Sequence, residues 1–289
     1  MLASTVLFGF MVVAIRLAAA SLHTFEIAFF RNFFGLLAAL PLLFIHGPGL
    51  LRTTQFPRYL FRCLVGVTSM LCGFWAIGHL PLAQAVSLSY STPLFVTIAA
   101  AALLGEQVRA RRWVAVALGF CGVLLIVRPG SAQFSAGTLV ALMAALLSSI
   151  VAIQIKQLSA TEPADRIVIW TTLLWVPMLL VPALGVWEWP QGITWLWVVA
   201  AGVFGTGGHM LWTRALKLGE VSALTPISFM QLPLVGLFGW LLFEETLDAW
   251  TVAGTLVILG SNAYIAHREA TLARRAASGA SSSAAKPGE

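Results

Sequence analysis

The sequence predicts an all-α membrane protein, with ten transmembrane helices that form two inverted five-helix repeats around a central cavity. Three observations predict this fold: an apolar composition, ten apolar stretches of nearly membrane-spanning length, and a second half that repeats the first with its loop charges reversed. Hydrophobic residues make up 59 % of the 289 residues and charged residues only 10 %, whereas soluble domains carry about 25 % charged residues. A core cannot hide so many apolar side chains, so most of the excess must face lipid.

Ten apolar stretches come close to the roughly 20 residues that a helix needs to cross the hydrocarbon core of a bilayer. The first is expected to be a retained helix, because Arg16 follows most of its apolar residues, whereas a signal peptide carries its positive charge before them. The ten helices are expected at residues 2–21, 25–46, 59–79, 82–104, 112–128, 135–156, 167–186, 193–213, 221–243 and 250–267.

The distribution of Lys and Arg predicts the orientation of these helices. If the N-terminus is cytoplasmic, three of the 17 basic residues (Arg16, Arg31 and Arg128) fall on the opposite side, which leaves 14 on the cytoplasmic side. Membrane proteins generally carry such an excess of positive charge in their cytoplasmic loops. The sequence therefore predicts a multi-pass protein of the bacterial inner membrane with both termini in the cytoplasm. The same bias accounts for the net charge of +6 without nucleic-acid binding.

The second half of the chain repeats the first at a shift of 139 or 140 residues. Glu106 then corresponds to Glu245, and Pro93 corresponds to Pro233. Because five is an odd number of helices, the second copy must enter the membrane upside down. Accordingly, the loop after Glu106 is rich in arginine, whereas the loop after Glu245 carries Asp248 and is expected on the outer side. Inverted repeats of this kind are typical of secondary transporters.

The repeat divides the chain into three segments. Residues 1–130 are expected to form the first five-helix repeat and residues 131–268 the second, inverted one. Residues 269–289 are rich in Ala and Ser with scattered charges. Because this segment is too polar to be buried, it is expected to be a disordered cytoplasmic tail.

Each half carries a Pro in its fourth helix, then an apolar–Glu motif, then small residues in its fifth helix. The pattern consists of Pro93, Glu106, Ala115 and Gly122 in the first half, and of Pro233, Glu245, Gly254 and Ser261 in the second. With it the sequence resembles the EamA-type drug/metabolite transporters over nearly all of the chain, although Ala115 and Ser261 stand where that family often has glycine. The resemblance implies a ten-helix bundle with a central substrate cavity, and transport of amino acids and other small metabolites, mostly outward. Some branches of the family export aromatic amino acids.

Polar side chains inside apolar helices are candidates for the substrate site, because such groups are costly in lipid unless they are paired or line water. Four helices carry them at helical spacing, and these are inner helices in the family pattern. Each residue also has a structural interpretation: Ser and Thr often bond their own backbone, and the aromatic residues and histidines can serve packing or the membrane interface. The candidates are Trp75, His79, Gln84, Ser87, Tyr90, Ser91, Thr206, His209, Thr213, Ser228 and Gln231.

Pro93 and Pro233 are candidate hinges for alternating access. Proline removes a backbone donor and loosens the helix around it, and these two stand at equivalent places in the two halves. A static kink that shapes the bundle is the alternative. Gly119 and Gly122 give the fifth helix a small face for close packing, against either the same chain or a partner.

The positions of the charged residues predict the mechanism. All carboxylates lie in loops, the tail or helix ends, whereas proton-coupled pumps bury an Asp or Glu in the membrane. No P-loop, cofactor motif or metal-ligand spacing is present, so no cofactor is expected. Facilitated diffusion by alternating access is therefore expected, with a proton relay through His79 or His209 left open. No Lys or Arg is expected at mid-membrane depth, which argues against phosphorylated sugars and favours neutral and aromatic amino acids.

Two alternatives remain open. One is a proton-coupled multidrug exporter of amphipathic compounds, which the missing buried acid disfavours. The other is an intramembrane hydrolase that uses Ser87 or Ser91 with His209, although the sequence lacks the usual Gly-x-Ser-x-Gly elbow. The expected partners are a small-molecule substrate and the lipid bilayer, and the expected state is a monomer or weak homodimer. The sequence leaves open which amino acid is preferred.

Overall fold

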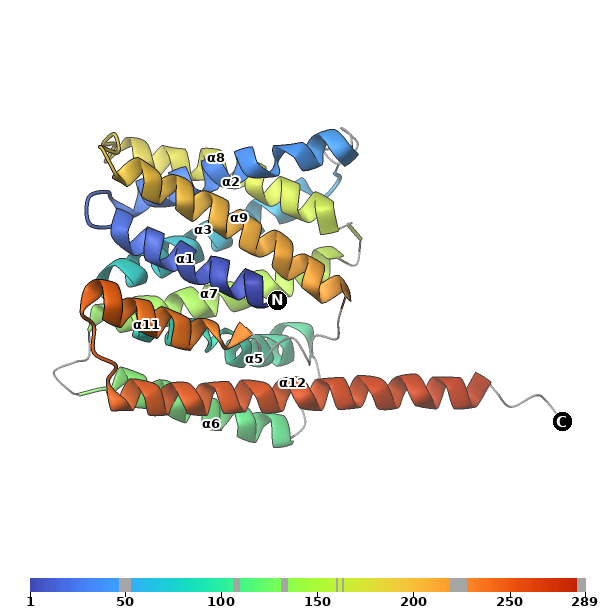
Figure 1. The fold of residues 1–289 in the computed structure, drawn as a ribbon. Coiled ribbons are helices and arrows are strands. Elements are labelled where there is room, and N and C mark those ends of the chain that lie inside the picture. Colours follow the sequence, from blue (N-terminus) through green and yellow to red (C-terminus); the bar gives the residue numbers. More distant parts are fainter. Residues whose placement is uncertain are drawn as a thin grey trace.

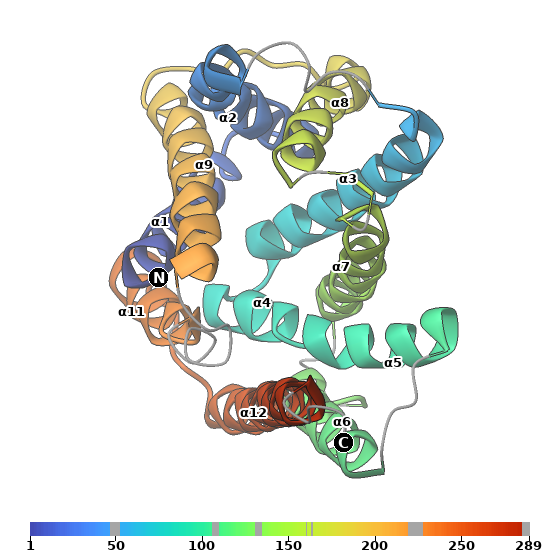
Figure 2. The ribbon, with the colours of Figure 1, turned by 90° about the vertical axis from the view of Figure 1, so that its right-hand side faces the viewer.

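All regular secondary structure in the described part of the chain is α-helical, as the sequence predicts. The structure, a computed structural model, describes all residues except 47–52, 106–109, 131–134, 160, 163, 219–227 and 285–289. Its helices are α1 (Leu2–Ala18), α2 (Thr24–His46), α3 (Phe56–His79), α4 (Leu82–Ser89), α5 (Thr92–Leu104), α6 (Ala110–Val127), α7 (Ala136–Ser159), α8 (Ala164–Leu184), α9 (Thr194–Leu218), α11 (Gln231–Phe243) and α12 (Ala249–Ala284). Many of them run in a similar direction in Figure 1, whereas α3, α4 and α5 lie across it, as Figure 2 shows.

Within the described residues, five helical segments are long and apolar enough to cross a membrane, by their length and composition. They agree with the predicted all-α membrane fold, because a helix needs about 20 apolar residues to cross the bilayer. They are Phe56–His79, Leu82–Ala102, Ala110–Val127, Ala136–Leu158 and Ala249–Arg268.

The helix pairings are symmetric between the two halves of the chain. α1 packs on α9 as α7 packs on α3, and α2 packs on α9 as α8 packs on α3. The pairs α2–α8 and α6–α12 join equivalent helices of the two halves. They lie on opposite sides of the bundle when it is viewed along the helices (Figure 2). α1 and α7 run in opposite directions, as an inverted repeat requires (Figure 1).

The two halves meet most closely where α6 crosses α12. A Cβ atom added to Gly122 would lie 2.7 Å from the carbonyl oxygen of Gly254, and one added to Gly254 would lie 2.5 Å from the carbonyl oxygen of Gly122. Only glycine at both positions allows this backbone-to-backbone contact. The small face of the fifth helix is therefore covered by a helix of the same chain.

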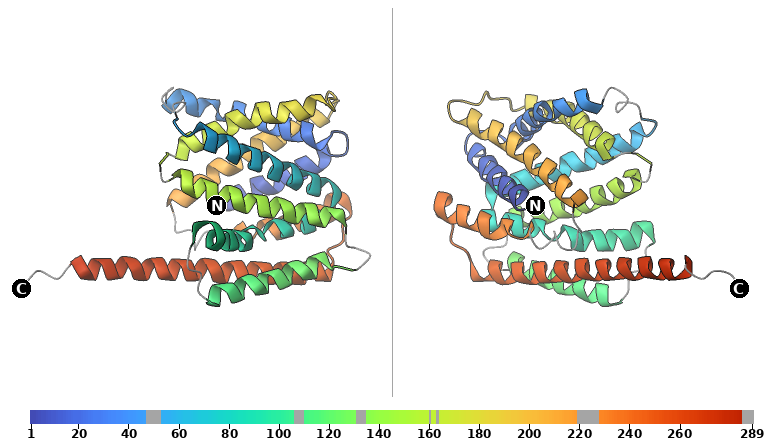
Figure 3. Two further views of the ribbon diagram at one scale, coloured as in Figure 1. Left: turned by 180° about the vertical axis from the view of Figure 1, so that it is seen from behind. Right: turned by 45° about the vertical axis from the view of Figure 1, so that its right-hand side comes forward.

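Two predicted boundaries differ from the structure. The helix predicted at residues 82–104 is divided into α4 and α5, because Pro93 cannot accept the hydrogen-bonding pattern of a helix interior and stands in the first turn of α5. The helix predicted to end at residue 267 continues as α12 through Ala284, into the segment expected to be disordered. Alanine and arginine are strong helix formers, which sustains the helix beyond the bundle (Figures 1 and 3).

An ion pair joins the two halves at the distal end of the bundle, by which we mean the end opposite both chain termini. Arg16 of α1 lies 3.2 Å from Glu245, which belongs to the loop between α11 and α12. Arg16 also donates hydrogen bonds to the carbonyl oxygens of Ile77 and Leu80 at the end of α3, at 2.7 and 3.2 Å. The second oxygen of Glu245 accepts the backbone N–H of Leu82 at the start of α4, at 2.7 Å. We call this group the distal clamp.

A second ion pair stands beside the distal clamp. Arg128, at the end of α6, pairs with Asp248. Asp248 also accepts the backbone N–H of Thr251 at 3.0 Å and so caps the start of α12. The acids of the α11–α12 loop thus compensate two of the three arginines that the sequence places at this end, which explains why the repeated motif changes its charge.

At the terminal end, Glu162 ties the loop between α7 and α8 to the loop before α3. Its carboxylate accepts hydrogen bonds from the hydroxyl of Thr53 at 2.8 Å and from the guanidinium of Arg166 at 2.6 Å. Burial raises the pKa of Glu162, but the hydrogen bonds from Arg166 and Thr53 outweigh it, so the pKa lies below its ordinary value.

We predict that two replacements of Glu245 distinguish the effect of its hydrogen bond to the Leu82 N–H from the effect of its negative charge. Glu245→Ala leaves the buried N–H of Leu82 unpaired and should lower the free energy of unfolding by about 2 kcal/mol. Burial raises the pKa of Glu245 against the opposing effects of the Leu82 N–H and Arg16, so the fold disfavours its ionised form. Glu245→Gln keeps an acceptor oxygen and should stay within about 1 kcal/mol of the wild type.

Thermal unfolding of the detergent-solubilised protein checks this prediction. Glu244→Ala is the matched control, because Glu244 is the exposed neighbour in the same loop. Equal melting temperatures for the Glu245→Ala and Glu244→Ala variants would contradict the role of the clamp.

We also predict a pH-dependent contribution from Glu162. Because its folded-state pKa is lowered, Glu162 stabilises the fold above the ordinary glutamate pKa of about 4.3, and this stabilisation is lost as the pH falls through the lower folded-state value. Glu162→Gln should therefore melt a few degrees below the wild type at pH 6, with the difference vanishing near pH 3. The exposed Glu188, replaced by Gln, serves as the control; a difference for Glu162→Gln that did not change with pH would refute the assignment.

Candidate functional site

An interrupted helix of the first half meets the start of α11 from the second half. In the first half, α4 ends at Ser89 and α5 begins at Thr92, with Tyr90 and Ser91 in the turn between them. In the second half, a turn at Phe229 and Met230 precedes α11. Interrupted helices inside membranes expose backbone groups where transporters commonly bind their substrates. We call Tyr90, Ser91, Ser228, Phe229 and Gln231 the helix-break junction.

Tyr90 joins the break between α4 and α5 directly to the start of α11. Its hydroxyl donates to the carbonyl oxygen of Ser228 at 2.8 Å and lies 3.5 Å from Oε1 of Gln231. Its ring packs edge-on against Phe229, with ring centroids 5.6 Å apart. The structure thus brings together three of the predicted site residues, which come from opposite halves of the chain.

Asn262 of α12 supports the junction and was missed by the sequence analysis. Its side-chain amide donates to the carbonyl oxygen of Tyr90 at 2.7 Å, which satisfies a backbone group freed by the helix break. Its own Oδ1 is buried without a hydrogen-bond partner. The signal was an amide in the middle of the last apolar stretch, a position at which a polar group is costly unless it is paired.

Ser87 and Ser91 serve the packing of α4. Ser87 donates to the carbonyl oxygen of Ala83 at 2.6 Å and accepts the hydroxyl of Thr255 from α12 at 2.7 Å. Ser91 is fully buried and donates to the carbonyl oxygen of Leu88 at 2.6 Å. Their hydroxyls are therefore used within the protein, and Ser91 contributes to the junction through its place in the turn.

The candidate hinges lie at helix starts and not within helices. Pro93 stands in the first turn of α5, and Pro233 is the third residue of α11. Both side chains are exposed. In a first turn the missing backbone N–H breaks no hydrogen bond, so these prolines mark the helix breaks without straining the helices that follow. Their role as hinges stays a prediction.

The candidates on α3 and the start of α4 have local contacts. Trp75 and His79 stack on each other at 3.9 Å between ring centroids, and Nδ1 of His79 lies 2.8 Å from the carbonyl oxygen of Trp75. His79 is exposed at the distal end of α3. Gln84 is half-buried on α4. These contacts leave their role in substrate binding a prediction.

The candidates on α9 face its two neighbours, α1 and α2. The hydroxyl of Thr206 lies against Gly35 of α2, where an added Cβ atom would come within 2.7 Å of it. His209 packs edge-on against Phe8 of α1, with ring centroids 5.1 Å apart. The side chain of Thr213 lies outside the described residues.

Two arginines lie about two turns inside their helices, deeper than the loops in which the sequence analysis counted them, although neither is at the middle of its helix. Arg31 is the eighth residue of α2, about two turns from its start. Arg62 lies as deep in α3, is buried, and donates to the hydroxyl of Thr171 on α8. A stretch of some 20 apolar residues stays apolar on average with one arginine in it, so composition alone does not reveal the depth of either side chain.

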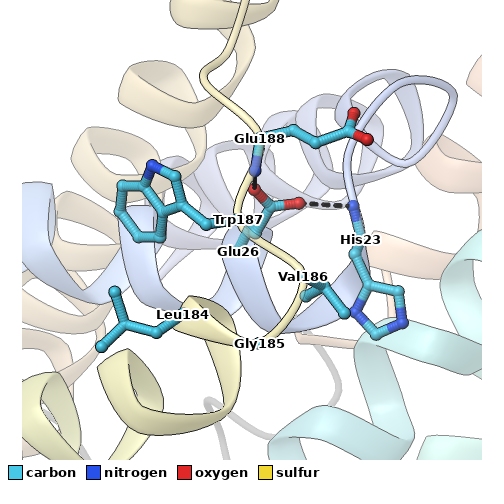
Figure 4. Close-up of a pocket in the computed structure, with 7 residues that line it drawn as sticks. All are labelled: His23, Glu26, Leu184, Gly185, Val186, Trp187 and Glu188. Atoms are coloured by element: carbon cyan, nitrogen blue, oxygen red, sulfur yellow. Dashed lines mark hydrogen bonds between the residues drawn. The ribbon is translucent and has the colours of Figure 1, made fainter.

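Two hollows open at the ends of the bundle. The distal one has a volume of about 580 Å³ and lies between the start of α2 and the α8–α9 loop (Figure 4). In it Glu26 accepts the backbone N–H groups of His23 at 3.0 Å and Glu188 at 2.5 Å, so it caps α2 and holds the loop. The other, about 610 Å³, surrounds Glu162 at the terminal end. Both are held by structural hydrogen bonds and lie away from the junction, and the central cavity stays a prediction.

Comparison with known proteins agrees with this architecture. A solved crystal structure aligns with 95 % of this chain and 96 % of its own length at a TM-score of 0.64 and 19 % sequence identity, which shows that the fold is shared. A riboflavin transporter of Vibrio cholerae is 32 % identical over 78 % of this chain and 76 % of its own. A pseudopaline exporter of Pseudomonas aeruginosa is 32 % identical over 87 % of this chain and 89 % of its own.

A third relative, an S-adenosylmethionine uptake transporter of Rickettsia felis, is 26 % identical over 86 % of this chain and 84 % of its own. The EamA-like transporter family matches the chain twice, at residues 1–128 and 135–266. These two matches cover the two halves whose helix pairings mirror each other. The protein is therefore a membrane transporter that belongs to the EamA-like transporter family.

Proposed function

We propose that this protein exports amino acids, the neutral and aromatic ones among them, and similar small metabolites from the cytoplasm by alternating access. The observation that carries the proposal is the helix-break junction. There Tyr90 and Phe229, from opposite halves, place an aromatic pair beside the uncharged polar groups of Ser228 and Gln231. Aromatic walls with a few fixed polar groups suit a neutral or zwitterionic metabolite.

The two halves are proposed to rock about the junction, so that the substrate faces one side of the membrane at a time. In this structure the distal clamp ties α1, α3 and α4 to the α11–α12 loop. We propose that the distal end faces the outside, which places both termini in the cytoplasm of a bacterial inner-membrane protein. The Lys and Arg bias of the loops supports this orientation.

The direction of transport is proposed to be outward. The relatives include an exporter as well as transporters of riboflavin and S-adenosylmethionine, so the family handles chemically varied small molecules. The exporter matches this chain at 32 % identity over 87 % of its length. Together with the uncharged aromatic junction, this similarity supports export of amino-acid-like compounds.

Transport is proposed to need no ion gradient. The described acidic residues lie in loops, in the first turn of a helix or in the extension of α12 beyond the bundle. None of these described carboxylates lies near the middle of a membrane-spanning helix, where proton-coupled transporters commonly place theirs. We further propose a monomer or a weak homodimer, because the small-residue face of α6 is covered by α12 of the same chain.

A proton-coupled exporter of amphipathic compounds is the second candidate, and Glu245 favours it. Burial raises the pKa of this carboxyl, against the opposing Leu82 N–H and Arg16, so it takes up a proton more readily than a free glutamate does. Because Glu245 joins the two halves, its protonation would weaken the distal clamp from the acidic side of the membrane.

Counterflow in proteoliposomes distinguishes these two candidates. With a panel of amino acids and no pH gradient, we expect labelled substrate to accumulate against unlabelled substrate at a rate that an imposed pH gradient changes less than twofold. Strict dependence on the gradient in the wild type, abolished in Glu245→Gln, would replace facilitated diffusion with proton coupling. Failure of every amino acid to exchange would refute the proposed substrate class.

The junction predicts a specific effect of Tyr90→Phe. The variant keeps the ring against Phe229 but loses the hydrogen bond to Ser228, which is worth about 1 kcal/mol. We expect the substrate concentration for half-maximal counterflow to rise about fivefold. Tyr264→Phe, on the exposed part of α12, is the matched control, and equal behaviour of the two variants would contradict the role of Tyr90.

A further inference from the structure

Arg31 is a half-buried cation between three helices, and no described carboxylate pairs with it. It extends from α2 towards α1 and α9, on the side of α2 away from the exposed Phe33 and Leu37. Its guanidinium donates to Oδ1 of Asn32 at 2.9 Å and approaches the sulfur of Met11 at 3.9 Å. Its Nε atom is buried and has no hydrogen-bond partner.

The acid nearest to Arg31 along α2 is already engaged elsewhere. Glu26 lies five residues earlier and accepts the backbone N–H groups of His23 and Glu188. Within the described part of the chain, no Asp or Glu lies within 4.0 Å of the Arg31 guanidinium. Charged side chains in membrane helices are normally paired or functional, because an unpaired one is costly there.

The surroundings of Arg31 are built to hold its guanidinium in place. Asn32 is itself fixed, because its amide donates to the carbonyl oxygen of Ala28 at 2.7 Å, which turns its oxygen towards Arg31. Gly205 of α9 leaves the space that the guanidinium occupies: an added Cβ atom would lie 2.8 Å from Nη2 and 3.0 Å from Nε of Arg31. One side of the Arg31 guanidinium is thus held by Asn32, and its other N–H groups remain for another acceptor.

An aromatic pair lies one helical turn further along α9. His209 follows Gly205, which contacts Arg31, by four residues. Its ring packs against Phe8 of α1. Arg31, Asn32 and His209 therefore combine a cation, an amide and an aromatic wall, on helices that belong to opposite halves of the transporter.

We propose that Arg31 binds the carboxylate of the transported substrate. The inference rests on the proposed function and deepens it, since it limits the substrates to metabolites that carry a carboxylate. A guanidinium matches a carboxylate geometrically, with two parallel N–H donors for two oxygens. A single cation compensates one negative charge, which favours a carboxylate over a doubly charged phosphate. Because α9 and α2 come from different halves, the substrate also bridges the two bodies that must move.

The test compares amino acids with their amino alcohols, which lack only the carboxylate. In counterflow and in ligand-induced thermal shift, the wild type should prefer L-phenylalanine to L-phenylalaninol by about tenfold, the expected loss of a hydrogen-bonded charge pair. Arg31→Met should abolish this preference. We expect it to weaken the binding of L-phenylalanine and to leave the binding of L-phenylalaninol unchanged. It should also melt no lower than the wild type without ligand, because it removes an uncompensated charge.

Two further variants separate binding from structure. Gly205→Ala displaces the flexible ends of Arg31 and Met11 without removing the charge, and it should reduce the preference for the carboxylate. Arg62→Met is the matched control, because it removes the other arginine within a helix, whose partner is the Thr171 hydroxyl; it should keep the preference. A marked fall in the ligand-free melting temperature of Arg31→Met, with the preference intact in Gly205→Ala, would assign Arg31 to structure and overturn the proposal.

The outcomes also separate this inference from the proposed function. If the wild type exchanges amino acids and Arg31→Met shows the same preference for the carboxylate, only the assignment of Arg31 is overturned. If the wild type exchanges the amino alcohols as well as the amino acids, the carboxylate requirement is overturned while amino-acid export stands. If the wild type exchanges none of these compounds, the proposed function fails, and the inference with it.

Discussion

The structure depends on one constraint: backbone groups inside a membrane must find partners within the protein. A continuous helix meets this constraint by itself, but a helix break leaves carbonyl oxygens exposed. Here side chains from distant parts of the chain supply the missing donors. Asn262 serves the carbonyl of Tyr90, Tyr90 serves that of Ser228, and Arg16 serves the last carbonyls of α3. The break between α4 and α5 is therefore stabilised across the two halves, since Asn262 and Ser228 both belong to the second half. The hydrogen bonds from Arg16 to the end of α3 stay within the first half.

This constraint links the stability of the fold to its activity. If the two halves move against each other as proposed, the hydrogen bonds that cross between them, those of Asn262 and Tyr90, must be exchanged. A neutral hydrogen bond, such as that of Tyr90 to Ser228, costs less free energy to break than a buried ion pair. The ion pairs of Arg16 and Arg128 stand instead at the distal end, in or beside loops, where water is near when they separate.

Much of the fold was predictable because the membrane imposes lengths and charge rules on the sequence. The apolar stretches gave the helices, and the repeated motif around Glu106 and Glu245 indicated the duplication that gives the family its two-repeat fold. The extent of α12 was not predictable in the same way, because Ala-rich polar segments have high helix propensity and yet lack an apolar face.

The candidate site was predictable only in part. Tyr90, Ser228 and Gln231 meet because polar residues on inner helices converge, which periodicity can reveal. Ser87 and Ser91 carry the same signal but bond within the protein, and no pattern in one sequence separates the two cases. Asn262 and Arg31 escaped because each stands with one polar neighbour in an otherwise apolar stretch, and the depth and contacts of the side chain depend on tertiary packing.

The contact between Gly122 and Gly254 makes the duplication mechanically unequal. At the repeat shift of 139, their counterparts are Ser261 and Ala115, which both carry a Cβ atom, so the repeat does not reproduce a contact between two glycines there. If one half tilts against the other, it would turn about a contact that lies off centre. The same tilt would then open the two ends of the transporter unequally.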